Sequence, residues 1–223
     1  MVKWNNRDLS ELGIIVETIP TISKAKKKIN VMQVEGRNGF VSIDTGTYEP
    51  FSITLECHCK DSANLDEIKA FLDGYGTISF DNERQYTAII NNAIPISTVL
   101  PIFKRFVVSL LVNPIAEDIT PTTVSLLGED SVDITTYATV FPTLEIECTG
   151  NVSVTINNTT FYLNGTDGTY TLDCKNKVIV DENGTNSSGL MLGDFPTFKN
   201  GSNIIYTTGT ITSFSAEYRK SYL

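Results

Sequence analysis

The chain has 223 residues, with 17 basic and 26 acidic side chains and a formal net charge of −9. Hydrophobic residues make up 41% and charged residues 19%, which is typical of a globular protein and excludes a disordered or fibrous one. The acidic balance argues against a nucleic-acid partner. No run approaches the ~20 apolar residues of a membrane helix, and the polar residues 1–10 lack a signal core, so we expect no membrane partner and synthesis in a cytoplasm.

Short alternating segments punctuated by Gly, Asn, Asp or Pro predict a mainly β, antiparallel fold. The first distinctive segment is a basic cluster at residues 24–28, which we interpret as a solvated loop or exposed strand edge rather than a polyanion patch. The next, Gly36-Arg37-Asn38-Gly39, predicts a tight hairpin turn in which glycine supplies a positive φ and Arg37 is exposed. Contact with a partner protein is the alternative interpretation of Gly36, Arg37, Asn38 and Gly39.

One helix is expected, over residues 64–73. Asn64 can cap its start with Glu67 three positions on, apolar residues follow at helical spacing, and Gly74 ends it. A long strand over 103–112 should end at Asn113-Pro114.

The stretch from 116 to 123 has the acidic, Thr and Pro composition of a linker, so we place a domain boundary near residue 119. The expected domains are therefore 1–119, β with one helix, and 120–223, a β-sandwich.

The second half predicts two hairpins and a final strand. In the first hairpin, 152–156 turns at Asn157-Asn158 into 159–163. In the second, 170–174 turns at Lys175-Asn176 into 178–180. The final strand, 210–218, should place four residues on one face: Thr212, Phe214, Ala216 and Tyr218.

The cysteines and the single histidine form no convincing metal site. His58 lies between Cys57 and Cys59, but on a strand it points away from both thiols, and no second ligand cluster completes a tetrahedral site. We expect no metal, no cofactor and four free thiols, the other two being Cys148 and Cys174.

Catalysis is not expected either. His58 has no evident nucleophile partner in the sequence, although a triad can assemble from distant residues. Carboxylate pairs such as Asp44 with Glu49, or Asp167 with Asp173, arise by chance in a β protein of this size.

A carbohydrate-binding or adhesin module is the rival from another class. It would use the second half and require exposed aromatic platforms. The single tryptophan, Trp4, lies in the other half, and Phe161, Tyr170, Phe214 and Tyr218 occupy positions that suit a core. The candidates left for a surface are Tyr162, Tyr206 and Tyr222.

The order of motifs resembles the distal tail protein family of long-tailed phages over nearly the whole chain. The first half carries the opening strand with Leu12-Gly13-Ile14, the turn 36–39, the helix, and the runs 76–81 and 103–114. The second half carries matching motifs at 141–146, 157–158, 172–173, 193–196 and 200–203.

This resemblance implies a structural tail protein and no enzyme. The N-terminal domain, sandwich- or barrel-like, would form a hexameric ring at the end of the tail tube, and the C-terminal domain would be a galectin-like β-sandwich. The implied partners are further copies of the chain, the major tail tube protein, a tail-associated fibre or lysin protein and, in some phages, receptor-binding proteins. The protein would be a component of the virion tail tip.

Overall fold

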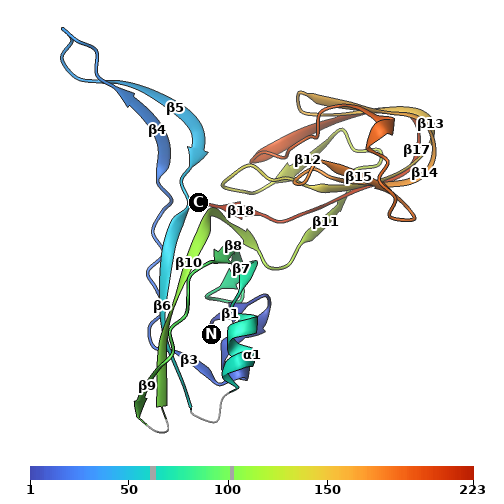
Figure 1. The fold of residues 1–223 in the computed structure, drawn as a ribbon. Coiled ribbons are helices and arrows are strands. Elements are labelled where there is room, and N and C mark those ends of the chain that lie inside the picture. The colour runs from blue at the N-terminus through green and yellow to red at the C-terminus, as the bar shows by residue number, and fades with distance from the viewer. Residues whose placement is uncertain (61–63, 101–102) are drawn as a thin grey trace. The chain divides into compact units, whose positions relative to one another are not determined.

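Strands dominate the computed structural model, which describes residues 1–60, 64–100 and 103–223, so the predicted mainly β fold class is confirmed (Figure 1). The chain divides into two units, one of residues 1–116 with Leu223 and one of residues 117–222. The division falls inside strand β10 (Phe103–Asp118), three residues before the position near 119 that the linker composition suggested.

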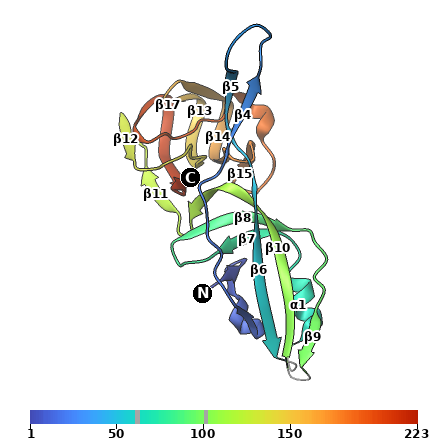
Figure 2. The ribbon, with the colours of Figure 1, turned by 90° about the vertical axis from the view of Figure 1, so that its left-hand side faces the viewer.

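A single curled antiparallel sheet forms the body of the first unit, with strand order β2-β1-β7-β8-β10-β6-β3 and β9 paired to β10 (Figures 1 and 2). Its buried core includes Trp4, Cys57 and Cys59, none of which is exposed. The elements besides β10 are β1 (Lys3–Trp4), β2 (Arg7–Asp8), the 3-10 helix η1 (Leu9–Leu12), β3 (Ile14–Val16), β6 (Phe51–Lys60), α1 (Leu65–Phe71), β7 (Gly74–Ser79), β8 (Arg84–Ile90) and β9 (Ser97–Leu100).

The N-terminal hairpin β1–β2 is joined by Asn5-Asn6, both at positive φ, which is the signature of a two-residue turn that matches strand twist. The turn is fastened to β7 twice: the Asn5 N–H donates to the Thr77 carbonyl at 2.8 Å, and the Thr77 N–H donates to Asn5 Oδ1 at 2.9 Å. Trp4 is thereby held over Gly76, which has no side chain to obstruct the indole.

The predicted helix is confirmed as α1. Asn64 Oδ1 accepts a hydrogen bond from the Glu67 N–H at 3.3 Å, which is the expected N-cap. The Glu67 carboxylate accepts from Arg7 at 3.3 Å, and so ties the helix to β2. Gly74 follows the helix with φ of 68°.

The predicted end of the long strand at Asn113-Pro114 is wrong, because β10 continues to Asp118. Its pairing with β6 ends at the Val112–Phe51 pair, so the missing N–H of Pro114 removes no bond from that ladder.

Strands β4 (Lys27–Met32) and β5 (Val41–Tyr48) form a separate two-stranded sheet within the first unit. We call residues 26–49 the arm, since the Glu49 N–H donates to the Lys26 carbonyl at 2.8 Å and closes its base. The ribbon projects beyond the curled sheet, and its tip lies at the opposite end of the unit from β3 (Figures 1 and 2).

The second unit is a two-layered sandwich built by three bent strands that serve in both layers: β13 (Thr143–Ile156), β14 (Thr159–Asp173) and β17 (Gly201–Tyr218). Their halves near the β13–β14 turn pair with β12 (Ser131–Ile134) and β16 (Met191–Gly193). Their other halves pair with β11 (Thr122–Ser125) and β15 (Val178–Asp181). The 3-10 helix η2 (Ser188–Leu190) precedes β16.

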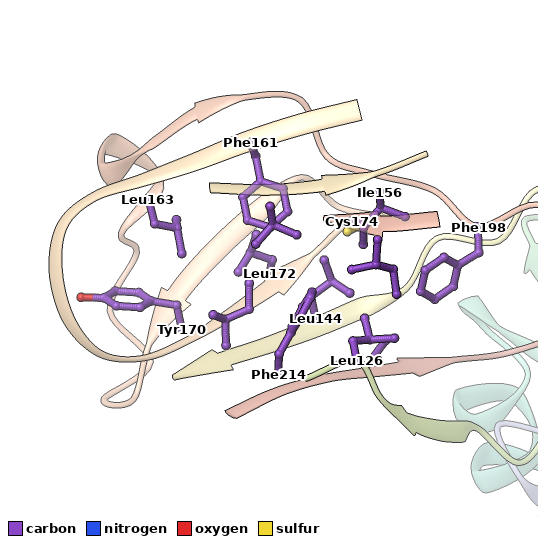
Figure 3. Close-up of a cluster of buried hydrophobic side chains, with 14 of the residues drawn as sticks. Leu126, Leu144, Ile156, Phe161, Leu163, Tyr170, Leu172, Cys174, Phe198 and Phe214 are labelled. Carbon is purple, nitrogen blue, oxygen red and sulfur yellow. The ribbon is translucent and has the colours of Figure 1, made fainter. Parts of the chain in front are cut away.

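Both layers turn apolar side chains inward, and the cluster between them includes Phe161, Leu172 and Phe214 (Figure 3). The expected core aromatics are confirmed: Phe161, Tyr170, Phe214 and Tyr218 are all buried. The first predicted hairpin turn is also confirmed, with Asn157 at φ of 55°. In the second, the positive φ falls on Lys177, beyond the expected pair Lys175-Asn176.

The predicted face of the last strand is wrong at one residue. Phe214, Ala216 and Tyr218 are buried, but Thr212 is exposed. A bulge is the cause: β13 pairs Glu147 with Ser213 and then Cys148 with Ile211, so Thr212 is the extra residue. Ile211 packs against the core in its place.

The sandwich begins and ends at one place. The Asp118 N–H donates to the Lys220 carbonyl at 3.0 Å, and β18 (Ser221–Tyr222) pairs with β10. The Arg219 guanidinium donates to the carbonyls of Asp118 and Ile119. The first and last segments of this unit are therefore hydrogen-bonded to each other.

Candidate functional site

The arm exposes apolar side chains on both of its faces. Ile29 and Val31 lie on one face, and Met32 and Ile43 on the other, since residues two apart and cross-strand partners share a face. Each of these four side chains is about half exposed, between 47% and 59%. An isolated two-stranded ribbon is marginally stable in water, and exposed apolar clusters mark interaction surfaces. The arm therefore has the properties of a surface that a partner covers.

The basic cluster lies at the base of the arm and is exposed, as expected. Lys26 pairs with Glu49 at 3.0 Å, and Lys27 pairs with Asp44. Within the described residues, Lys24 and Lys28 make no ion pair. The cluster thus strengthens the ribbon with two cross-strand ion pairs and leaves further positive charge available.

The turn singled out from the sequence lies at the arm's tip. Gly36 and Gly39 have φ of 79° and 90°, so the positive φ expected there is present. The turn is wider than expected, because β4 and β5 are joined by eight residues, 33–40, of which the Arg37 N–H donates to the Val34 carbonyl at 3.1 Å. Arg37 and Phe40 are both exposed, Phe40 by 65%. Whether this tip contacts a partner stays a prediction.

His58 does not assemble a nucleophile site in the described part of the chain. It lies on the outer face of β6, whereas Cys57 and Cys59 on the same strand are buried in the core. Its Nδ1 is 3.5 Å from the Glu17 carboxylate. The Arg105 guanidinium forms an ion pair with the Glu17 carboxylate at 2.5 Å. His58 therefore lies beside a surface ion-pair cluster.

The carboxylate pairs considered for hydrolysis have structural partners. Asp44 and Glu49 pair with lysines across the arm. Asp167 accepts the Gly150 N–H at 2.8 Å, and Asp173 accepts two N–H groups of the turn that follows it. Each of these four carboxylates thus stabilises a local turn or ribbon.

None of the four cysteines forms a disulfide, and all four are buried. Burial raises the pKa of the Cys57 and Cys174 thiols to about 12, so these two thiols stay protonated at neutral pH. Among the residues that the structure describes, no group of three or more potential ligands is placed to hold a metal ion. In the same residues, no helix has the length and apolar character to cross a membrane.

The sandwich carries a second exposed surface. Four strand segments of one layer contain no charged residue, although the whole chain is strongly acidic: 152–156, 159–163, 191–193 and 201–208. Tyr162 and Leu192 are cross-strand partners there, 45% and 65% exposed, and Tyr206 is 62% exposed. Tyr162 and Tyr206 are the exposed aromatic side chains here that the rival carbohydrate-binding function would use.

The chain shares its fold with a solved phage protein. It matches a solved structure with a TM-score of 0.78, over 100% of this chain and 98% of that one, at 13% sequence identity. That structure is SPP1 Dit (gp 19.1), described as a paradigm of the hub adsorption apparatus in phages that infect Gram-positive bacteria. The expected fold is therefore confirmed. No protein-family model and no curated protein matches the sequence.

Proposed function

We propose that the chain is a non-enzymatic hub of a phage tail tip and belongs to the distal tail protein family. Its copies form a closed ring, a hexamer by the resemblance, at the end of the tail tube. The fold shared with SPP1 Dit supports the class of protein, and the exposed arm supports self-assembly.

The exposed surface of the arm supports self-assembly. A ring of identical subunits joins one patch to a different patch on the next copy. Every free subunit must therefore expose a surface that is covered only when it docks onto its neighbour. The arm is such a surface: it has apolar side chains on both faces, and its outer edges have no strand partner among the residues that the structure describes.

The remaining partners follow from the position of such a ring. The tail tube protein would contact one side, a tail-associated fibre or lysin protein the other, and in some phages receptor-binding proteins the periphery. The protein would act in the virion tail tip after synthesis in the bacterial host cytoplasm. The buried thiols and the structural pairing of the carboxylates support a role without catalysis or cofactor.

Removal of the arm tests the assembly. Residues 29–44 replaced by Asn-Gly should leave the melting of the first unit nearly unchanged, because neither arm strand belongs to its sheet. The wild-type chain should form rings in mass photometry and negative-stain images, alone or with its tube partner, and the shortened chain should not. Rings from the shortened chain, or monomers from the wild type under all these conditions, would contradict the proposal.

Arg37→Glu tests the tip more finely. It should weaken ring formation or tube docking while leaving the melting temperature unchanged, because Arg37 is exposed. Lys199→Glu makes the same charge change at an exposed position of the sandwich and serves as the control. Normal rings and docking in Arg37→Glu would remove the role of this turn and leave the ring itself standing.

A further inference from the structure

A cavity of about 320 Å³ opens beside β3 and η1 in the first unit. That volume lies at the small end of the about 300–1,000 Å³ that ligand pockets span. Its walls are mostly apolar, with Asp8 and Ser10 as the polar lining residues, and Ile15 and Ile19 are about half exposed. The apolar lining residues are Met1, Val2, Leu9, Ile14, Ile15, Val16 and Ile19.

One carboxylate interrupts this apolar lining. Asp8 is 8% exposed, and its Oδ1 accepts the Ser10 N–H at 2.8 Å, which caps η1. Its Oδ2 is buried and has no hydrogen-bond partner among the described residues. Burial raises the pKa of Asp8, but the hydrogen bonds from Ser10 and the positive charges of the N-terminus and Lys3 outweigh it and hold the pKa below its usual value. The carboxylate is therefore ionised, and one of its oxygens is unpaired.

The strand beside the cavity also has an open edge. β3 is the last strand of the sheet and pairs with β6 on one side, while its other edge has no strand partner within residues 1–60, 64–100 and 103–223. Apolar side chains, an open strand edge and an unpaired buried carboxylate together define an acceptor for an extended, apolar segment that carries a cation.

The arm tip has this chemistry. Phe40 is a large exposed apolar group, and Arg37, three residues away, makes no ion pair in the described chain. The tip cannot reach the cavity of its own chain, because the arm projects from the opposite end of the unit from β3 (Figures 1 and 2). Because the arm tip and the cavity lie at opposite ends of the first unit, they can meet only between two copies, and that contact is head-to-tail.

We propose that the cavity beside β3 receives the arm tip of a second copy, with Phe40 among its apolar walls and the Arg37 guanidinium on Asp8 Oδ2. This assignment rests on the proposed ring and names the acceptor surface within it. The guanidinium satisfies the unpaired oxygen with a charge-assisted bond, and Phe40 covers the apolar lining that a lone chain leaves open to water.

Removing or reversing the charges at positions 8 and 37 tests the pairing. Asp8→Asn keeps an acceptor for the η1 cap and removes the charge, so it and Arg37→Glu should each raise the concentration needed for assembly by about tenfold or more. Asp8→Arg combined with Arg37→Asp should recover assembly relative to Arg37→Asp alone. Tryptophan fluorescence of Trp4 reports whether the first unit of each variant is folded.

Disulfide trapping provides a readout that does not depend on the charges. Ile15→Cys with Phe40→Cys should form intermolecular disulfides on mild oxidation, because the four native thiols are buried. Ile15→Cys with Lys199→Cys is the control and should not. Rings that form normally in Asp8→Asn, or that give no cross-link between positions 15 and 40, would overturn this site while the proposed ring stands. A wild type that forms no ring and no cross-link refutes both.

Discussion

Gly76→Ala should destabilise the first unit without changing any polar group. A Cβ at position 76 would lie 2.6 Å from Trp4 Cζ2 and 2.3 Å from Asn5 Oδ1, both far inside van der Waals contact. Trp4 is completely buried and cannot swing aside into solvent. The Asn5 side chain can move, but it then gives up its bond from the Thr77 N–H.

The loss of stability can be estimated from the crowding of Trp4 and the displacement of the Asn5 side chain. Forcing an extra methyl into a packed site costs about 1–3 kcal/mol, and losing one hydrogen bond about 1 kcal/mol. We therefore expect a loss of about 2–4 kcal/mol in the free energy of unfolding, or roughly 10 °C in melting temperature for a unit of this size.

The assay is selective, because Trp4 is the single tryptophan and lies in the core of the first unit. Its fluorescence during urea unfolding follows that unit, and far-ultraviolet circular dichroism follows the whole chain. Gly189→Ala in the sandwich is the control for the substitution itself: a Cβ there meets nothing within 4 Å and its φ is not positive, so neither the fluorescence nor the circular dichroism transition should move. A Gly76→Ala chain that unfolds at the wild-type urea concentration would refute the close packing of the turn on β7.

Phe161→Ala should cost about 3–5 kcal/mol in the sandwich, because this side chain is fully buried, whereas its exposed neighbour Tyr162→Ala should cost under about 0.5 kcal/mol. Equal unfolding midpoints of these two variants by circular dichroism would contradict the placement of Phe161 in the core and Tyr162 on the surface. A fragment of residues 117–222 should melt cooperatively and give no signal on a glycan array; an unfolded fragment or micromolar sugar binding would each defeat one half of that expectation. Thiol titration at pH 8 should find Cys57 and Cys174 unreactive in the folded chain, since their pKa of about 12 keeps them protonated, and four reactive thiols after denaturation. Fewer than four after denaturation of fresh protein would show that some had been paired.

Local signals in the sequence predicted what local contacts determine. Asn64 and Glu67 gave the helix start because an N-cap involves residues three positions apart. Asn157 gave the hairpin turn because its side chain tolerates positive φ. Strand ends depend on distant partners, and the predicted strand end at Pro114 was wrong for that reason. The missing N–H of Pro114 costs no ladder bond, because the pairing of β10 with β6 has already ended at Val112.

The candidate site was partly visible in the sequence. The turn 36–39 could be found from its glycines, but the length and exposure of the arm could not, since alternating residues look the same whether a sheet covers them or not. Asp8 carries a weak local signal as the N-cap of a short helix. Its unpaired oxygen and the cavity around it arise from packing between η1, β3 and the N-terminal residues, which no sequence pattern reports.

The hydrogen bonds that join the first and last segments of the sandwich set an order of events during synthesis. The first unit, apart from Leu223, is complete once residue 116 has left the ribosome. The sandwich has to wait, because β11 pairs with β17 and Asp118 bonds to Lys220, about a hundred residues later. We therefore expect the arm-bearing unit to fold on the nascent chain, with the sandwich closing once residues up to 222 have emerged.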